Sequence, residues 1–220
     1  QDRIAQQVQH RESSEFKKDK LKVLAELTKL RQICCDPRLH YEDYKAGSAK
    51  LDTCMELVHG ALDGGHRILL FSQFTGMLDI IGKRLAKEDI AFLKLTGASS
   101  KESRAKMVAQ FQAGEVPVFL ISLKAGGVGL NLTAADVVIH YDPRWNVAAQ
   151  DQATDRAHRI GQQHAVTVYK LIAKDTIEER IMQMQESKRD LVNSVLGGDG
   201  ISSALFTRED VLALLGGDGR

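Results

Sequence analysis

The sequence predicts an α/β fold in which a parallel β-sheet is covered by helices on both faces. Short apolar runs with the length of strands alternate with helical patterns between residues 67 and 172. Parallel strands need long crossover connections, most often helices, so this alternation is typical of a parallel sheet. Such a sheet is covered on both faces, because its crossover helices lie against them. We expect five such strands, with a helical extension after the last one.

Two amphipathic helices are expected before the sheet. The first should end where Asp36 and Pro37 interrupt the pattern, because proline cannot continue a helix. Its predicted apolar positions are Val23, Leu27, Leu30 and Cys34. The second should begin after Ser48, whose hydroxyl can cap the first turn, and should end at Gly64 and Gly65. Its predicted apolar positions are Leu51, Met55, Val58 and Leu62.

The strands and their connecting helices then follow in alternation. The strands are expected at residues 67–72, 91–95, 116–122, 136–142 and 165–172, and the helices between them at residues 77–88, 99–112 and 146–160. A glycine-rich loop, instead of a helix, connects the third strand to the fourth. Parallel sheets bind ligands beyond the carboxyl ends of their strands. The loops expected to carry a site therefore comprise residues 72–76, 96–100, 122–133 and 142–146.

Three segments organise the chain. Residues 1–46 are expected to form a helical lead-in, residues 47–173 the α/β domain, and residues 174–220 a helical extension. The extension should begin with a long charged helix at residues 175–196, followed by a glycine-rich joint and a short helix that Thr207 can cap. The chain begins at Gln1 instead of Met, so we expect it to be part of a longer protein.

Composition excludes several classes of protein. Of the 220 residues, 43% are hydrophobic and 27% are charged, as in ordinary globular domains. The net charge of +1 means that any affinity for nucleic acid must come from a local patch. No apolar run reaches the length of about 18 residues that a membrane-spanning helix needs, so no membrane partner is expected. The three cysteines lack the spacing of a zinc site or a disulfide framework, and we expect reduced, mostly buried thiols in an intracellular protein.

Arg156 and Arg159 stand three residues apart in a helical pattern and should therefore share one face of that helix. Two neighbouring guanidinium groups repel each other, and an anion in front of them would relieve the repulsion. The chain has no GxxxxGK[ST] loop to hold phosphates and no acidic cluster to hold Mg²⁺, so these arginines would reach a triphosphate held by a different domain. The alternative is a salt-bridged helix face, because Asp151 and Asp155 precede Arg159 at four-residue spacing. Spacing alone leaves both interpretations open.

The glycine-rich loop, SLKAGGVGLNLTAAD, follows the third strand. Its glycines, among them Gly127 and Gly129, allow a tight turn and a close approach to a phosphate or a ribose. The spacing does not satisfy GxGxxG, and no helix clearly opens behind it, so the pattern of a dinucleotide site is not met. Taken alone, the loop is equally well explained as a structural turn.

Four segments occur in a fixed order along the chain: RILLFSQFTGMLDII, LTGASSKESRAKMVAQFQ, LISLKAGGVGLNLTAADVVIHYD and QATDRAHRIGQ. Together they resemble the second motor lobe of the SWI/SNF-type ATPases, the chromatin-remodelling branch of the superfamily-two helicases. The segments LRQICCDPRL and VTVYKLIAKDTIEERI resemble the flanks of that lobe, so the resemblance covers residues 24–196. It implies a RecA-like helicase C-terminal lobe at residues 47–173.

The resemblance implies that ATP binds in a cleft between two lobes of one polypeptide. The N-terminal lobe, whose motifs this sequence lacks, would carry the phosphate loop and the acids that hold Mg²⁺. Arg156 and Arg159 match the two finger arginines of the family, and Gln150, Gly127 and Gly129 match positions that line the ATP cleft. This chain alone is therefore expected to have no ATPase activity.

The resemblance also places double-stranded DNA across both lobes, held mainly through the phosphates of one strand in a grip that weakens with salt. The residues expected to face this DNA are Ser72, Gln73, Gly97, Ser122, Lys124, Arg144 and Trp145, with Lys101 and Arg104 nearby. Each has a structural alternative, above all Trp145 as core filler. The family often has DPWWNPA where this chain has DPRWNVA, so Arg144 can add a phosphate contact while Val147 replaces a proline that would stiffen the loop.

Two other functions are open on the sequence alone. One is an RNA helicase lobe, although the last motif of those proteins usually carries glycine where this chain has Asp155. The other is a non-catalytic protein-docking module. We expect a bacterial relative of the remodellers, which would be cytoplasmic and located at the nucleoid; a eukaryotic source would place the protein in the nucleus.

Overall fold

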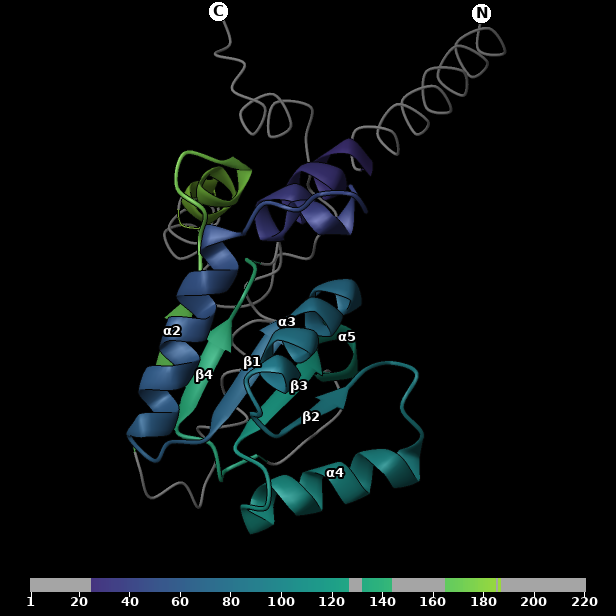
Figure 1. Cartoon of the computed structure of the whole chain (residues 1–220), viewed down its shortest axis with the longest axis vertical. Coiled ribbons are helices and arrows are strands. Elements are labelled where there is room, and N and C mark those ends of the chain that lie inside the picture. Colours follow the sequence, from purple (N-terminus) through teal and green to yellow (C-terminus); the bar gives the residue numbers. More distant parts are fainter. Residues whose placement is uncertain (1–24, 127–131, 144–164, 185, 187–220) are drawn as a thin grey trace, which may run out of the picture.

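The computed structural model describes residues 25–126, 132–143, 165–184 and 186. These residues contain five strands: β1 (Ile68–Ser72), β2 (Phe92–Leu95), β3 (Val118–Ser122), β4 (Val137–His140) and β5 (Thr167–Lys170). All four pairings are parallel, and the strands lie in the order β2-β3-β1-β4-β5 (Figure 1). The five strands expected from the sequence are therefore confirmed.

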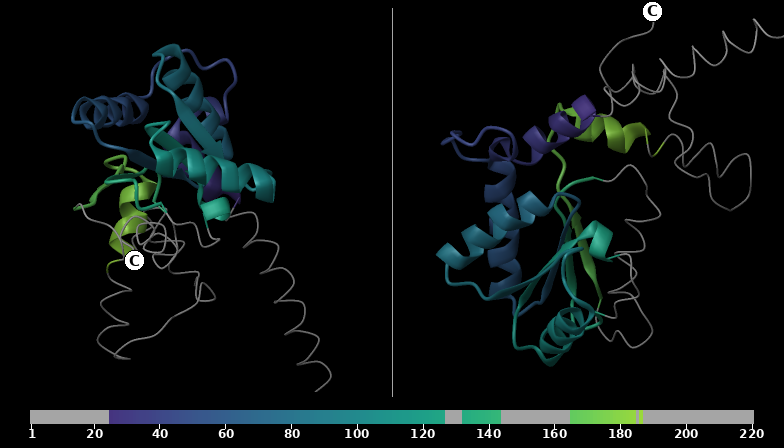
Figure 2. Two further views of the ribbon diagram at one scale, coloured as in Figure 1. Left: turned by 90° about the horizontal axis from the view of Figure 1, so that it is seen from below. Right: turned by 90° about the vertical axis from the view of Figure 1, so that its right-hand side faces the viewer.

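Helices lie on both faces of this sheet (Figure 2). One face is covered by α2 (Ala49–Asp63) and α3 (Thr75–Lys87) and the other by α4 (Lys101–Ala113) and the single turn α5 (Leu123–Gly126). Alternate residues of a strand point to opposite faces. In β1, Ile68 and Leu70 pack against α2 and α3, whereas Leu69 and Phe71 belong to the cluster that contains α4 and α5. The α/β architecture with both faces covered is as predicted.

Local sequence explains where the helices begin and end. Ser48 Oγ accepts a hydrogen bond from the Leu51 amide at 3.4 Å, and α2 ends at Gly64, as predicted. Ser100 caps α4 in the same way, and α4 ends at Gly114, whose φ of 78° lies in the left-handed region that favours glycine. α5 was not expected, because the sequence suggested only a loop after β3. It forms because Ser122 Oγ accepts a hydrogen bond from the Ala125 amide at 3.3 Å.

The segments before and after the sheet pack against each other. Residues 25–35 and 177–184 are helical and lie at the same end of the molecule (Figure 1). Leu27, Ile177 and Ile181 form a small buried cluster between them. The first helix ends before Asp36, which caps the 3₁₀ turn η1 (Pro37–Leu39). The predicted helices at residues 146–160 and 207 onward, and most of the helix at 175–196, lie outside the described residues.

The predicted apolar face of the first helix is wrong at Leu30. Its side chain is 41% exposed, and the buried positions of this helix are Leu27, Arg31 and Cys35. These positions are four residues apart and therefore lie on one face. The buried face thus includes a charged side chain, whereas the sequence pattern was built only from apolar residues.

The cysteines agree with the sequence analysis. All three thiols are free; Cys35 and Cys54 are buried, and Cys34 is half-buried. Burial raises the pKa of Cys54 to about 12, so its thiol stays protonated at neutral pH. Among the described residues, no helix combines the length and the apolar character needed to cross a membrane.

Candidate nucleic-acid interface

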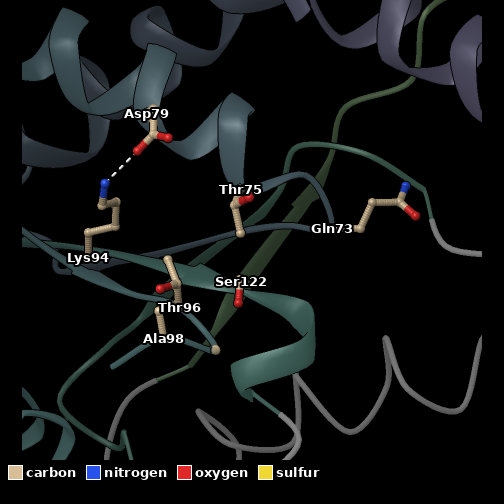
Figure 3. Close-up of a pocket in the computed structure, with 8 residues that line it drawn as sticks. Gln73, Thr75, Asp79, Lys94, Thr96, Ala98 and Ser122 are labelled. Atoms are coloured by element: carbon tan, nitrogen blue, oxygen red, sulfur yellow. Dashed lines mark hydrogen bonds and ion pairs between the residues drawn. The ribbon is translucent and has the colours of Figure 1, made fainter. Parts of the chain in front are cut away.

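An open hollow of about 410 Å³ lies at the carboxyl ends of three adjacent strands, and we call it the edge hollow (Figure 3). Loops after β1, β2 and β3 form it. Its lining consists of Gln73, Thr75, Asp79, Lys94, Thr96, Gly97, Ala98 and Ser122. This is the edge at which parallel sheets bind ligands, and three of the four loops singled out from the sequence meet here. Among its polar groups, the hydroxyls, the Gln73 amide and the Lys94 ammonium can donate to an anion, whereas Asp79 contributes a carboxylate.

The N-terminus of α3 opens at this hollow. Phe74 is its N-cap residue and provides no side-chain hydrogen bond to the first turn, which also contains no acidic residue. Thr75, the first helical residue, lines the hollow (Figure 3). A helix N-terminus carries partial positive charge, and an uncapped one leaves amide donors for an anion. The N-terminus of α3 therefore attracts negative charge to the edge hollow.

The turn after β2 brings Gly97 to the rim of the edge hollow. Ser99 Oγ accepts a hydrogen bond from the Thr96 amide at 3.2 Å and closes this turn. A Cβ atom added at Gly97 would meet no atom within 4 Å among the described residues. The described fold therefore does not require a glycine here, and because Gly97 is exposed, a ligand backbone can approach it.

The turn after β3 is held from a neighbouring helix. Ser122 borders the edge hollow but is almost fully buried, and its hydroxyl begins α5 as described above. Arg104 on α4 donates from Nη1 to the Ala125 carbonyl oxygen at 3.1 Å. Arg104 thus fixes α5, which carries the backbone of Lys124. The side chain of Lys124 lies outside what the structure describes.

Ser72 does not fit the role of phosphate donor that the sequence suggested. The residue is fully buried, its hydroxyl donates to the Asp142 carboxylate, and its Oγ accepts from the Phe74 amide at 3.1 Å. The backbone amide of Gln73 also donates to Asp142, at 3.1 Å, and the side-chain amide of Gln73 donates to the Pro143 carbonyl oxygen at 3.3 Å. Both residues hold the segment after β4, and Gln73 in addition lines the edge hollow.

Arg31 completes this buried arrangement from the lead-in helix. Its Nη2 donates to the Pro143 carbonyl oxygen at 2.6 Å, and its guanidinium lies over the Phe74 ring, 5.8 Å from the centroid. Burial lowers the pKa of Arg31, and the Asp142 carboxylate partly opposes that effect. Burial raises the pKa of Asp142, while Ser72, Gln73 and Arg31 act in the opposite direction. Sequence reasoning missed Arg31 and Asp142; the signal was an arginine spaced by four from Leu27 and Cys35.

The remaining predicted site residues lie outside the described residues. They are Gln150, Gly127 and Gly129 of the expected ATP site, the arginines Arg156 and Arg159, and Arg144 and Trp145 of the expected DNA surface. Of the predicted set, the structure therefore brings together Gln73, Gly97 and Ser122 at one edge. In the part of the chain that is described, no three metal-binding side chains gather where they could hold a metal ion.

The five-stranded parallel sheet with helices on both faces defines a RecA-like motor lobe. Residues 49–161 match the family model of the helicase conserved C-terminal domain, and the chain belongs to this family as the second motor lobe of a SWI/SNF-type ATPase. The chain is 41% identical over 198 residues to an uncharacterized ATP-dependent helicase of Mycoplasma pneumoniae. This matched region covers 90% of this chain and 19% of the relative. It is also 44% identical over 152 residues to the human chromatin-remodeling ATPase INO80, and this match covers 69% of this chain and 10% of the relative.

A solved structure gives the same assignment. The Sulfolobus solfataricus SWI2/SNF2 ATPase core in complex with double-stranded DNA matches with 35% identity and a TM-score of 0.70, over 87% of this chain and 41% of that one. The relatives are thus ATP-dependent helicases and chromatin-remodelling ATPases. This chain spans about a fifth or less of the length of the two relatives above.

Proposed function

We propose that this chain is the C-terminal lobe of a DNA-dependent ATPase that translocates along double-stranded DNA. The observation that carries the proposal is the edge hollow, where an uncapped helix N-terminus, hydroxyl groups and the ammonium of Lys94, paired with Asp79, lie at the carboxyl edge of the sheet. Such donors suit the phosphates of a nucleic-acid backbone. The DNA bound to the related Sulfolobus solfataricus core supports duplex DNA as the ligand.

In this proposal the phosphate contacts come from residues that the structure places at the edge hollow. Gln73, Thr75 and the first turn of α3 would contact one strand, and Gly97 would let the DNA backbone approach closely. Ser122 would act by shaping the turn that carries Lys124, because its own hydroxyl is engaged in α5. Arg144 and Trp145 directly follow Asp142 and Pro143 in the chain and would extend the DNA-binding surface of the protein.

The ATP half of the proposal rests on residue types and their order in the chain. Arg156 and Arg159 would stabilise the negative charge that develops on the transferred phosphoryl group. Gln150, Gly127 and Gly129 would line the same cleft. The N-terminal lobe of the same polypeptide would hold ATP and Mg²⁺, since this sequence contains no GxxxxGK[ST] loop. The protein would act on DNA at the nucleoid of a bacterium or in the nucleus of a eukaryote.

Gly97→Ala in the full-length protein tests the DNA surface. We expect duplex-DNA affinity to fall by about tenfold, because a methyl group forced into a close contact costs about 1–3 kcal/mol and 1.4 kcal/mol corresponds to about tenfold. Fluorescence anisotropy with labelled duplex DNA at fixed salt measures the effect. Gly60→Ala is the matched control, since a Cβ there also meets nothing within 4 Å but lies on α2, away from the edge hollow.

Two outcomes would count against the proposal. If the Gly97→Ala and Gly60→Ala variants bind DNA with equal affinity, the edge hollow is not part of the DNA-binding surface. Tighter binding of duplex RNA than of duplex DNA, measured by competition in the same assay, would favour an RNA helicase lobe instead.

A further inference from the structure

We propose that Lys94 contacts a DNA phosphate and that Asp79 competes with that phosphate for the same ammonium group. The inference rests on the proposed function, because it requires DNA to pass over the edge hollow. It assigns roles to two residues that sequence reasoning did not single out. Asp79 would then set how tightly this lobe holds the DNA backbone.

The fold places the two side chains at one end of the edge hollow. Lys94 lies on the edge strand β2, opposite Leu120 of β3. Two residues earlier in β2, Phe92 points to the same face and packs against α3; a Cβ added at Gly82 of α3 would be 3.0 Å from its ring. Lys94 therefore emerges beside α3, where its ammonium donates to Asp79 Oδ1 (Figure 3).

This ion pair is exposed and can open at little cost. The side chains of Lys94 and Asp79 are 39% and 51% exposed. Ion pairs in such positions contribute little to stability, since water screens them and solvates either partner well. A phosphate that enters the hollow can therefore replace the carboxylate without disturbing the core of the fold.

The charges of the lining side chains explain why the replacement of Asp79 by a phosphate at Lys94 matters. Among the described residues that line the edge hollow, Lys94 is the single cation and Asp79 the single carboxylate, while the others are neutral. While the pair is closed, the lining side chains carry no net charge. When a phosphate takes the ammonium, Asp79 is left near a second negative group. Asp79 therefore weakens the hold on DNA, which keeps the contact reversible in a motor that has to release and re-engage phosphates.

Two substitutions in the full-length protein test the two roles. Lys94→Gln should lower duplex-DNA affinity and make the slope of log Kobs against log salt concentration shallower by about 0.9, the value for one phosphate contact on duplex DNA. Asp79→Asn should raise affinity by about two- to fivefold, the factor that corresponds to an exposed charge pair. Anisotropy titrations with duplex DNA at several salt concentrations measure both effects.

Asp52→Asn is the matched control for Asp79→Asn. Asp52 lies on α2, forms an exposed ion pair with Arg84 at 3.5 Å, and does not line the edge hollow. Asp52→Asn should leave DNA affinity nearly unchanged. Thermal unfolding of all three variants should match the unsubstituted protein, because both ion pairs are exposed.

Each result decides one part of the inference. If Lys94→Gln leaves the slope of log Kobs against log salt concentration unchanged, Lys94 does not contact a phosphate. A gain in Asp79→Asn no larger than in Asp52→Asn would overturn the competition. If Gly97→Ala weakens DNA binding while Lys94→Gln and Asp79→Asn have no effect, the DNA surface stands and only this inference fails. If none of the three variants changes DNA binding, the proposed function fails with it.

Discussion

Replacing Arg159 with alanine in the full-length protein should abolish ATP turnover and leave ATP binding almost unchanged. A finger arginine acts on charge that develops only in the transition state, so its removal affects the rate more than ground-state binding. The expected loss in kcat is about 10³- to 10⁵-fold. DNA-stimulated phosphate release measures turnover, and equilibrium titration with a fluorescent ATP analogue measures binding. Arg156→Ala should behave in the same way.

Arg84→Ala is the control for these variants. Arg84 is an exposed arginine of α3 that pairs with Glu88 and Asp52, and it is not part of the expected ATP site. Its replacement should leave turnover within about twofold, as expected for a surface position. The salt-bridged helix face, with Asp151 and Asp155 as partners, makes a different prediction. In that case Arg159→Ala would lower the unfolding temperature and retain turnover, which would contradict the finger assignment.

Glu178→Gln should destabilise this chain by about 3–5 kcal/mol, because it leaves a buried ammonium without its counter-charge. The Glu178 carboxylate accepts from Lys50 Nζ at 2.5 Å, and the side chains of Glu178 and Lys50 are 0% and 8% exposed. The same carboxylate accepts from the Ala173 amide at 2.9 Å. The Lys50 ammonium lies 5.3 Å from the centroid of the Tyr141 ring. Urea unfolding followed by circular dichroism measures the change in the free energy of unfolding.

A double substitution separates the ion pair from packing in general. Replacing a whole buried ion pair with apolar residues of similar volume is often neutral or stabilising. Lys50→Met combined with Glu178→Gln should therefore recover most of the stability that Glu178→Gln loses, since the glutamine oxygen can still accept from the Ala173 amide. A loss below about 1 kcal/mol in Glu178→Gln would contradict the account, since it would mean that water already solvates the pair.

This ion pair shows why the three predicted segments of the chain are not structurally separate. Glu178 belongs to the predicted extension and Lys50 to α2 of the predicted α/β domain. Cys35 of the predicted lead-in donates from Sγ to Glu178 Oε1 at 3.8 Å, and its carbonyl oxygen accepts from Tyr141 Oη at 3.0 Å. Contacts across such distances in sequence leave no periodic pattern, so composition and spacing could not reveal them.

The sheet could be predicted because each buried strand is a short apolar run bounded by polar or glycine residues. All residues from Val118 to Ile121 are buried, and so are all residues from Ile68 to Phe71. Consecutive burial is the pattern of a strand covered on both faces. The cap at Ser48 could also be predicted, because a hydroxyl before an apolar repeat is a local signal. The error at Leu30 arose because the pattern favoured an apolar side chain over Arg31, whose burial depends on the distant Pro143 carbonyl.

The sequence predicted the location of the candidate site at the carboxyl ends of the strands, but not the side-chain contacts within it. The order of the strands brings the loops of Gln73, Gly97 and Ser122 to one edge, as expected for a parallel sheet. Ser72 was misassigned because its partner Asp142 lies 70 residues away in sequence. Asp79 and Lys94 were missed because both read as ordinary surface charges in their own segments, and only the packing of α3 against β2 joins them.

ATP hydrolysis measured with the separated lobes tests the central claim most directly. This chain would be assayed alone, then with the N-terminal lobe of the same protein, and finally with both lobes and duplex DNA. We expect no hydrolysis by the chain alone, and turnover only when both lobes and duplex DNA are present. Hydrolysis by the chain alone would reveal a complete active site within these 220 residues and would contradict the two-lobe account.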